Sequence, residues 1–372
     1  MAERSDPPFR ADHVGSLLRP AALTQARAAR ERGELTAEAL TRVEDDAIRE
    51  AVHRQEDLGF KLATDGEFRR REWHMDFIRQ FANVRSVPSQ IKVRFHTTEG
   101  DTEVAPPGLR IEGRLSRPHP IFVDHFKFVQ SVTRVTAKQT IPSPTILHFR
   151  GGRAAVDRAA YPDMDAFFAD LARVYSEEIK DMAAAGCRYL QIDETNFAYL
   201  CDPALREQVR QNIGEDPDQL THTYARLLNA AIADRPADMK VCIHICRGNN
   251  QSAWLAEGGY DPVAEVLFNE VKVDGFFLEY DTARAGDFKP LRFMPRGPLV
   301  VLGLVSSKVP QLETNASIRR RIEEAARIVP LDQLALSPQC GFSSTIEGNK
   351  VTADDQWAKL KQVVDVAHDV WG

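Results

Sequence analysis

The sequence has no long apolar run and no excess of positive charge, and each absence excludes a class of protein. None of its apolar stretches approaches the roughly 20 residues that a membrane-spanning helix needs, so we do not expect a membrane protein. Its 54 acidic and 48 basic residues give a net charge of −6, whereas proteins that bind nucleic acids usually carry a basic surface. We therefore expect neither a membrane nor a nucleic acid as a partner.

Cysteine is also scarce, and the N-terminus lacks a charged segment followed by an apolar leader. The 372 residues include five cysteines, an odd number that suits free thiols better than a framework of paired disulfides. A missing leader is typical of a chain that is not secreted. We therefore predict a cytoplasmic protein whose thiols are reduced.

Short apolar runs alternate with amphipathic helical stretches, a pattern typical of a parallel sheet with crossover helices. The clearest helices are predicted at residues 36–59 and 163–186, and the second begins after Pro162 and ends at Gly186, as start and stop signals require. Eight strands are predicted, at residues 10–16, 61–67, 135–144, 189–194, 240–246, 275–280, 299–307 and 334–340.

Eight strands with crossover helices in this length predict a (β/α)8 TIM barrel, in which functional groups gather at the carboxyl ends of the strands. A Rossmann fold is disfavoured because no G-x-G-x-x-G follows a strand. We expect residues 1–372 to form a single domain with an insertion at residues 84–130, where Pro, Gly and β-branched residues indicate a hairpin or loop. The insertion is either a lid over the active site or a surface or oligomer-contact hairpin.

Four residues suited to a metal ion stand at the ends of predicted strands: His244, Cys246, Glu279 and Cys340. His244 and Cys246 share one face of their strand, because strand side chains alternate with period two. Two Cys, one His and one Glu suit zinc, and iron or copper is less suitable because the proposed reaction requires no redox chemistry. An isolated His-x-Cys pair more often belongs to the core, but three strand ends with the same character favour ligands. The other cysteines have no such setting and are predicted to be structural: Cys187, Cys201 and Cys242.

Further polar residues stand close to predicted strand ends: Ser16, Asp65, Glu67, Ser143, Asp193 and Glu194. In a barrel they would surround one axis. Acidic residues at such positions also serve as ion-pair partners or helix caps, and Asp193 and Glu194 could be one of each. The basic run at Arg69, Arg70 and Arg71 would suit an anionic substrate, although short charge runs more often form a solvated face or ion pairs.

In order along the chain, the segments DHVGSLLRP, TDGEFRR, YLQIDE, HIC, LEYD and SPQCGF resemble those of the cobalamin-independent methionine synthase family. The resemblance spans nearly the whole chain and concerns the catalytic barrel of the family and its short single-barrel relatives. Long members carry a second, N-terminal barrel, whereas this sequence contains one.

The resemblance implies a set of roles for the strand-end residues. His244, Cys246, Glu279 and Cys340 match the zinc ligands of the family, and the metal binds the thiol of homocysteine as a thiolate. Homocysteine-binding positions match Ser16, Glu67 and Asp193, with backbone N–H groups near Gly15 available to the substrate carboxylate and Glu194 beside them. Glu67 and Asp193 are the residues for which a catalytic role is predicted.

One departure concerns the methyl donor. Full-length members of the family carry a His after the seventh strand, thought to protonate the departing folate, and alignment on Pro310 places Val305 at that position here. Ser306, Ser307 or Lys308 would have to replace it, the lysine with a lowered pKa. A different donor is the simpler alternative, because short relatives of the family include enzymes that use methylcobalamin and others that open epoxides with coenzyme M.

The sequence therefore predicts a zinc-dependent methyltransferase that makes methionine from homocysteine, with methyltetrahydrofolate or another compound such as methylcobalamin as donor. Two alternatives stay open. One is alkyl transfer to a different thiol such as coenzyme M, although its sulfonate would prefer a basic pocket. The other is a non-catalytic barrel in which zinc is structural. A homo-oligomer is compatible with either.

Overall fold

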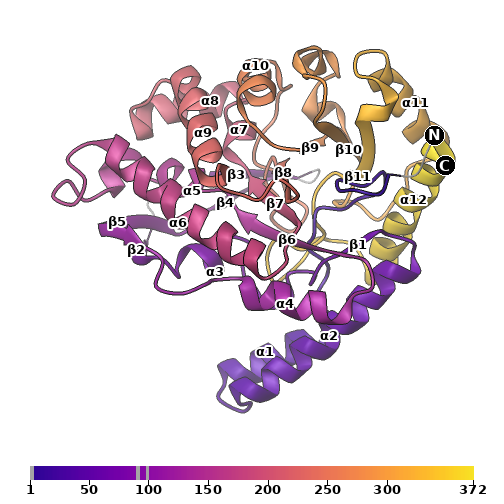
Figure 1. The fold of residues 1–372 in the computed structure, drawn as a ribbon, viewed down its shortest axis with the longest axis horizontal. Coiled ribbons are helices and arrows are strands. Elements are labelled where there is room, and N and C mark those ends of the chain that lie inside the picture. The colour runs from indigo at the N-terminus through magenta and orange to yellow at the C-terminus, as the bar shows by residue number, and fades with distance from the viewer. Residues whose placement is uncertain (1–3, 89–92, 98–99) are drawn as a thin grey trace.

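A seven-stranded parallel sheet forms the centre of the computed structural model, which describes residues 4–88, 93–97 and 100–372. The strands follow the order β1-β6-β7-β8-β9-β10-β11, and every neighbouring pair is parallel. The sheet is curled, with helices outside it (Figure 1). Its strands are β1 (Leu62–Ala63), β6 (Thr136–Pro142), β7 (Tyr189–Glu194), β8 (Lys240–Ile245), β9 (Gly275–Glu279), β10 (Leu299–Val305) and β11 (Leu334–Pro338).

The strands are buried along almost their whole length because both faces of the sheet are covered, as in other parallel sheets. All residues of β7, β9, β10 and β11 are buried. The resulting α/β architecture confirms the predicted class in its coarser form, a curled parallel half-barrel.

The predicted first strand, residues 10–16, is not a strand of this sheet. It forms a single parallel bridge, between Ala11 and Leu336 of β11. On its other side, the N–H of Leu17 donates to the carbonyl of Gly66 just beyond β1, at 3.0 Å. The segment therefore lies between the first and last strands of the sheet, but Gly15, with φ at +132°, interrupts its extended backbone.

The two clearest predicted helices are confirmed, with the expected caps. Thr36 accepts a hydrogen bond from the N–H of Ala39 at the start of α2, and Asp163 accepts one from the N–H of Ala166 at the start of α6. The longer helices are α1 (Ala21–Glu31), α2 (Ala37–Asp57), α4 (Val123–Val132), α6 (Met164–Ala184), α9 (Pro217–Ile232), α10 (Asp261–Glu270), α11 (Asn315–Ala326) and α12 (Ala353–Trp371).

Short helical segments lie in the loops between the longer elements. They are α3 (Met75–Ile78), α5 (Thr145–Phe149), η1 (Gly152–Ala155), α7 (Asn196–Tyr199), α8 (Pro203–Gln208), η2 (Val209–Ile213), η3 (Ala283–Ala285), η4 (Lys289–Phe293) and η5 (Leu331–Gln333). Among the described residues, no helix is both long and apolar enough to cross a membrane.

The predicted insertion contains two antiparallel strand pairs. β2 (Ala82–Val87) pairs with β5 (Gly108–Ser116), and β3 (Val93–Thr97) pairs with β4 (Gly100–Val104). Parts of the predicted range, residues 89–92 and 98–99, lie outside the described residues. The β3–β4 pair contacts the loop that follows β8, because His96 and Trp254 form an antiparallel bridge.

Candidate metal centre and active site

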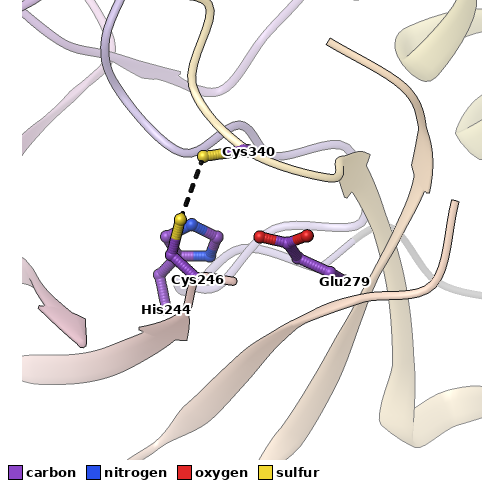
Figure 2. A group of neighbouring side chains, drawn as sticks. All are labelled: His244, Cys246, Glu279 and Cys340. Atoms are coloured by element: carbon purple, nitrogen blue, oxygen red, sulfur yellow. Dashed lines mark hydrogen bonds between the residues drawn. The ribbon is translucent and has the colours of Figure 1, made fainter. Parts of the chain in front are cut away.

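The four predicted metal ligands lie together at the carboxyl ends of the strands. One ligand atom from each of His244, Cys246, Glu279 and Cys340 lies within 4.8 Å of the others, and all four residues are buried. Figure 2 shows His244 and Cys246 at the end of β8, Glu279 beside them and Cys340 above them. Adjacent parallel strands end at the same edge, so residues up to 96 positions apart converge here.

Within the part of the chain that the structure describes, several polar atoms of the cluster have no hydrogen-bond partner and could therefore bind a cation. Both ring nitrogens of His244 and Oε2 of Glu279 are buried without a hydrogen-bond partner among the described residues. Buried polar atoms are rarely left unpaired, because their desolvation is then uncompensated. A divalent ion would satisfy these atoms, and two sulfurs, one nitrogen and one oxygen form a donor set that zinc accepts. The residues therefore fit the predicted metal.

The two sulfurs of the cluster interact directly. Sγ of Cys246 lies 3.4 Å from Sγ of Cys340 (Figure 2). The hydrogen bond from Cys246 holds the pKa of Cys340 well below its usual range, and neighbouring His244 lowers it further. The same hydrogen bond, together with burial, raises the pKa of Cys246. Of the two thiols, Cys340 is therefore the more acidic.

The charge at Cys340 also affects its neighbours. Burial acts to lower the pKa of His244, but the neighbouring Cys340, together with the charges of Asp193 and Glu279, outweighs it, so that the pKa is raised. Burial raises the pKa of Glu279, whose Oε1 accepts a hydrogen bond of 2.8 Å from the N–H of Arg247. One carboxylate oxygen is thus fixed by the backbone, while the other is free to bind an ion.

Asn249, which sequence reasoning missed, lies against the cluster and lines the cavity, and Lys308, which the sequence suggested only as a proton donor, holds Asn249 in place. Nδ2 of Asn249 lies 3.8 Å from Sγ of Cys340 and donates to the carbonyl of Gly341 at 3.0 Å. Lys308 donates to Oδ1 of Asn249 at 3.1 Å and to the carbonyl of Gly248 at 3.2 Å. The position of Asn249, three residues after Cys246 in a strand-end loop, was the available signal.

Glu67 has an unusual backbone conformation. Its φ is +61°, a left-handed value that non-glycine residues rarely adopt and that concentrates at functional sites. Three hydrogen bonds hold the conformation: the N–H of Glu67 donates to Oδ1 of Asp65 at 2.8 Å, and its carbonyl accepts from the side chain of Arg19 and the N–H of Arg70, both at 3.0 Å. The structure therefore fixes the direction of this side chain.

Glu67 and Asp193 line the same cavity, together with Ser16. Oε1 of Glu67 accepts from Oγ1 of Thr140 at 2.9 Å, and Oδ1 of Asp193 accepts from Nε2 of Gln191 at 2.7 Å. Burial, and next the charge of Glu67, raise the pKa of Asp193 to about 7. Burial likewise raises the pKa of Glu67. A bound ammonium group would favour the ionised form of both acids, so the pair suits such a group.

Gly15 and Glu194, the other predicted substrate-binding residues, do not line the cavity. At Gly15 a Cβ atom would come within 2.8 Å of Thr140, so the close approach requires glycine. The carboxylate of Glu194 accepts from Oγ1 of Thr145 at 2.5 Å and from the N–H groups of Asn196 and Phe197. It caps the turn that begins α7, the structural role that the sequence left open for one of the paired acids.

The residues expected to replace the missing histidine lie away from the cavity. Val305 is fully buried in the core at the end of β10. Ser306, Ser307 and Lys308 are buried too, and none of them lines the cavity. Oγ of Ser307 donates to Gln339 and to the carbonyl of Gly341, at 2.8 and 3.0 Å. The β10 loop therefore supports the cluster rather than facing a donor.

The basic run forms ion pairs with acidic residues of the same chain. Arg69 pairs with Glu44 and Asp45, Arg70 with Glu67, and Arg71 with Glu31. This is the structural alternative, and none of the three arginines lines the cavity. The cysteines predicted to be structural are buried outside the cluster: Cys187, Cys201 and Cys242.

The cavity at the mouth of the sheet has a volume of about 330 Å³. His244, Cys246 and Cys340 open onto it, as do Glu67 and Asp193. The remaining wall is mainly apolar and comes from the loop after β1, the β3–β4 pair, α5 and η2. One chamber therefore joins the candidate metal ligands, the acid pair and an apolar surface.

Comparison with known proteins agrees with this arrangement. The family model described as the catalytic domain of cobalamin-independent synthase matches residues 9–369. The uncharacterised proteins YxjH and YxjG of Bacillus subtilis are each 45% identical, over 98% and 99% of this chain and 95% and 96% of their own length. A 5-methyltetrahydropteroyltriglutamate–homocysteine methyltransferase of Mycolicibacterium paratuberculosis is 26% identical over 98% of this chain, which spans only 43% of that relative.

Solved structures give the same result. A structure from Listeria monocytogenes, described as a putative vitamin-B12 independent methionine synthase, has a TM-score of 0.76 and 37% identity, covering 99% of this chain and 100% of that one. A B12-independent methionine synthase from Shewanella sp. W3-18-1, in complex with selenomethionine, has a TM-score of 0.71 and covers 97% of both chains. At 20% identity it supports the fold alone. The protein belongs to the cobalamin-independent methionine synthase family of methyltransferases.

Proposed function

We propose that the protein is a zinc-dependent methyltransferase that converts homocysteine to methionine. The observation that carries the proposal is that three of the four candidate metal ligands, His244, Cys246 and Cys340, open onto the same cavity as Glu67 and Asp193. A thiol and an ammonium group are the two ends of homocysteine, and the cavity offers a partner for each. Membership of the methyltransferase family supports the same assignment.

Different residues of the cavity would bind different groups of the substrate. Glu67 and Asp193 would hold the ammonium group, and the hydroxyl of Ser16 is available to the carboxylate. His244, Cys246, Glu279 and Cys340 would hold zinc, which when bound supplies the positive charge that keeps a thiol deprotonated near neutral pH. The strained backbone of Glu67 fixes the orientation of the amino acid before reaction, which favours an in-line attack.

Features of the fold extend this proposal. Residues 10–17, between β11 and β1, would take the eighth position of a (β/α)8 barrel within a single domain. The insertion at residues 84–130 would act as a lid, since its β3–β4 pair contributes Val93, Phe95 and Val104 to the cavity wall. Methyltetrahydrofolate and methylcobalamin are the donors expected from the family resemblance.

Two observations disfavour the alternatives. The cavity lining includes Glu67, Glu72 and Asp193, whereas Arg150 is its only Lys or Arg among the described residues, so a sulfonate such as that of coenzyme M would be repelled. A purely structural zinc site is normally closed, whereas His244, Cys246 and Cys340 all reach the cavity surface.

The test is binding and conversion of homocysteine by zinc-loaded protein. X-ray absorption at the zinc edge should show one additional sulfur neighbour when homocysteine is added, and mass spectrometry should detect methionine when a suitable methyl donor is present. Cys201→Ala, which changes a buried cysteine outside the cluster, is the matched control for Cys246→Ala. An unchanged zinc spectrum at saturating homocysteine would refute the proposed function.

A further inference from the structure

Loops that follow three different strands meet at the carbonyl of Gly341, directly after the candidate ligand Cys340. Nδ2 of Asn249, from the loop after β8, donates to this oxygen at 3.0 Å, and so does Oγ of Ser307, from the loop after β10. Nδ2 of Asn349 is a third donor, at 3.3 Å. A carbonyl oxygen has two lone pairs, so three donors saturate it. The backbone that carries Cys340 is therefore held firmly in place.

The side-chain amide of Asn249 is fixed in one orientation by its partners. Its Oδ1 accepts from Nζ of Lys308 at 3.1 Å, while its Nδ2 donates to the carbonyl of Gly341. An ammonium group can only donate and a carbonyl can only accept, so the oxygen and nitrogen of the amide cannot be exchanged. Nζ of Lys308 also donates to the carbonyl of Gly248 at 3.2 Å. Both side chains belong to buried residues, so water competes little for these bonds.

The amide of Asn249 has a second N–H group, and a sulfur of the cluster lies within its reach. Nδ2 donates to Sγ of Cys340 at 3.8 Å, a length that the large radius of sulfur permits. Sγ of Cys246 contacts Sγ of Cys340, but among the described residues it accepts no hydrogen bond from an amide. The N–H group of Asn249 therefore distinguishes the two candidate sulfur ligands.

A site that methylates a zinc-bound thiolate would contain three thiolates once the substrate is bound. They are homocysteine, Cys246 and Cys340, and both cysteines line the cavity in which the reaction takes place. Each thiolate has a lone pair that can attack a methyl group. Attack by a cysteine would convert it into a neutral thioether, whereas the thiolate is the form that binds the metal. The site therefore needs a means of favouring the sulfur of the substrate over its own.

We propose that Asn249 is a positioning residue that slows methylation of Cys340 by donating a hydrogen bond to its sulfur. The inference rests on the proposed function and specifies how that site selects between sulfurs. A hydrogen bond to a charged acceptor is stronger than one to a neutral acceptor. Methylation makes the sulfur of Cys340 neutral, so the bond from Asn249 weakens during the attack and raises its barrier.

The reaction that this hydrogen bond opposes is a displacement at carbon. A lone pair of the Cys340 thiolate would form the new S–CH₃ bond. The bond between the methyl carbon and its leaving group would break, with its electron pair moving to the leaving group. Methyl iodide is a suitable probe, because it yields S-methylcysteine and iodide without a general acid. It is also small compared with a cavity of about 330 Å³.

The test exposes the zinc-loaded full chain to methyl iodide and follows methylation of each cysteine by peptide mass spectrometry. Cys246 is the internal standard, because it lines the same cavity and its sulfur lies 3.4 Å from that of Cys340. In the parent protein, Cys340 should be methylated more slowly than Cys246. Faster methylation of Cys340 would overturn the inference, and this comparison does not depend on the folding of any variant.

Two substitutions remove the N–H donor in different ways. Asn249→Asp keeps the size of the side chain and an acceptor for Lys308, whereas Asn249→Ala adds no charge. Each should raise the methylation of Cys340 relative to Cys246 about tenfold, the factor expected for a hydrogen bond to a charged acceptor. A rise in both variants cannot come from added charge alone or from wider access alone. An unchanged ratio in both would overturn the inference.

The matched control is Asn250→Asp, which adds a negative charge at the next residue of the same cavity lining. It should keep the methylation ratio of the parent protein. Zinc content is measured in every sample, and only fully loaded proteins are compared. A merely structural role of Asn249 would change zinc content or the methylation of both cysteines together, but not their ratio.

Homocysteine is tested separately in the same proteins, so that the two proposals fail in different ways. Methionine formation with equal methylation ratios in the parent protein and in both Asn249 variants would overturn the role of Asn249 and leave the proposed function intact. Absence of homocysteine from the zinc coordination sphere would refute the proposed function, even if the ratio of the two cysteines still depended on Asn249.

Discussion

Buried charges occur at both ends of the parallel sheet, but only at one end are they satisfied. Near the amino ends of the strands, Lys138 donates to Oδ1 of Asp12 at 2.8 Å and to the carbonyl of His13 at 2.6 Å, and the hydroxyl of Tyr189 donates to Oδ2 of Asp12 at 2.6 Å. Lys138 also lies over the rings of Tyr189 and Phe277. We call this group the floor network (Asp12, Lys138 and Tyr189).

At the carboxyl ends, buried polar atoms lack partners. They include both nitrogens of His244, Oε2 of Glu67 and Oε2 of Glu279. The same strands thus carry a closed network at one end and an open one at the other. A closed network stabilises the fold, whereas unpaired buried groups indicate the place where ligands complete the bonding. Four substitutions test this contrast.

The largest effect is expected at the open end, from Cys340→Ala. Removing one of four ligands should lower zinc affinity by more than about 100-fold, since even residues that only support metal ligands contribute 10- to 100-fold, and turnover should fall to background. Cys187→Ala, a buried cysteine outside the cluster, should keep full zinc occupancy. The zinc content of the purified variants is measured by elemental analysis. Unchanged zinc content in Cys340→Ala would show that the ligand set is wrong.

At the closed end, Lys138→Met should destabilise the protein by about 3–5 kcal/mol, because Asp12 would be left buried without its partner. Zinc content of the folded protein should not change, since the floor network contributes no ligand. Urea denaturation measures the effect. The exposed Lys350→Met is the control and should alter the free energy of unfolding by less than about 0.5 kcal/mol. A loss of zinc without a loss of stability would reverse the roles of the two ends.

Asp193→Asn tests the prediction that the buried carboxyl group of Asp193, at the open end, lowers the stability of the fold. Asp193 has a folded pKa of about 7 against an ordinary value of 3.8. Between pH 3.8 and about pH 7, the carboxyl group of Asp193 is ionised in the unfolded chain but still protonated in the folded protein. The contribution of Asp193 to stability therefore declines as the pH rises through this range and is lost above pH 7. Each pKa unit corresponds to about 1.4 kcal/mol.

The variant should therefore match the parent protein near pH 4 and exceed its stability at pH 8 by about 1–3 kcal/mol, while binding homocysteine more weakly. Chemical denaturation of both proteins at the two pH values, without substrate, measures the difference. Parallel stabilities at pH 4 and pH 8 would contradict a raised pKa at Asp193.

The open end was more accessible to sequence reasoning than the closed one. Strand periodicity and strand-end position were enough to select His244, Cys246, Glu279 and Cys340, because parallel strands bring their carboxyl ends together. The floor network joins residues 126 and 177 positions apart, and no local sequence pattern marks such distant partners.

Other errors have local causes. Glu194 follows Asp193 directly, and alternation along β7 turns its side chain to the opposite face, where it caps α7. The first predicted strand lacks regular pairing because Gly15 adopts a positive φ to pass Thr140. The apolar lining of the cavity was not predicted, because it comes from short helices and hairpin strands in loops. The conformation of such loops depends on packing rather than on a repeating sequence pattern.

The smallest effect is expected at Thr140, which connects the scaffold to the open end. Its hydroxyl donates to Oε1 of Glu67 at 2.9 Å and accepts from Arg70 at 3.0 Å. Thr140→Val keeps the shape of the side chain but removes this hydrogen bond, worth about 1 kcal/mol, so KM for homocysteine should rise about fivefold with zinc content unchanged. Thr140→Ser retains the hydroxyl and should restore KM. If valine and serine instead gave equal KM values, Glu67 would be oriented by its strained backbone and Arg70 alone, and the hydroxyl would belong to the closed part of the molecule.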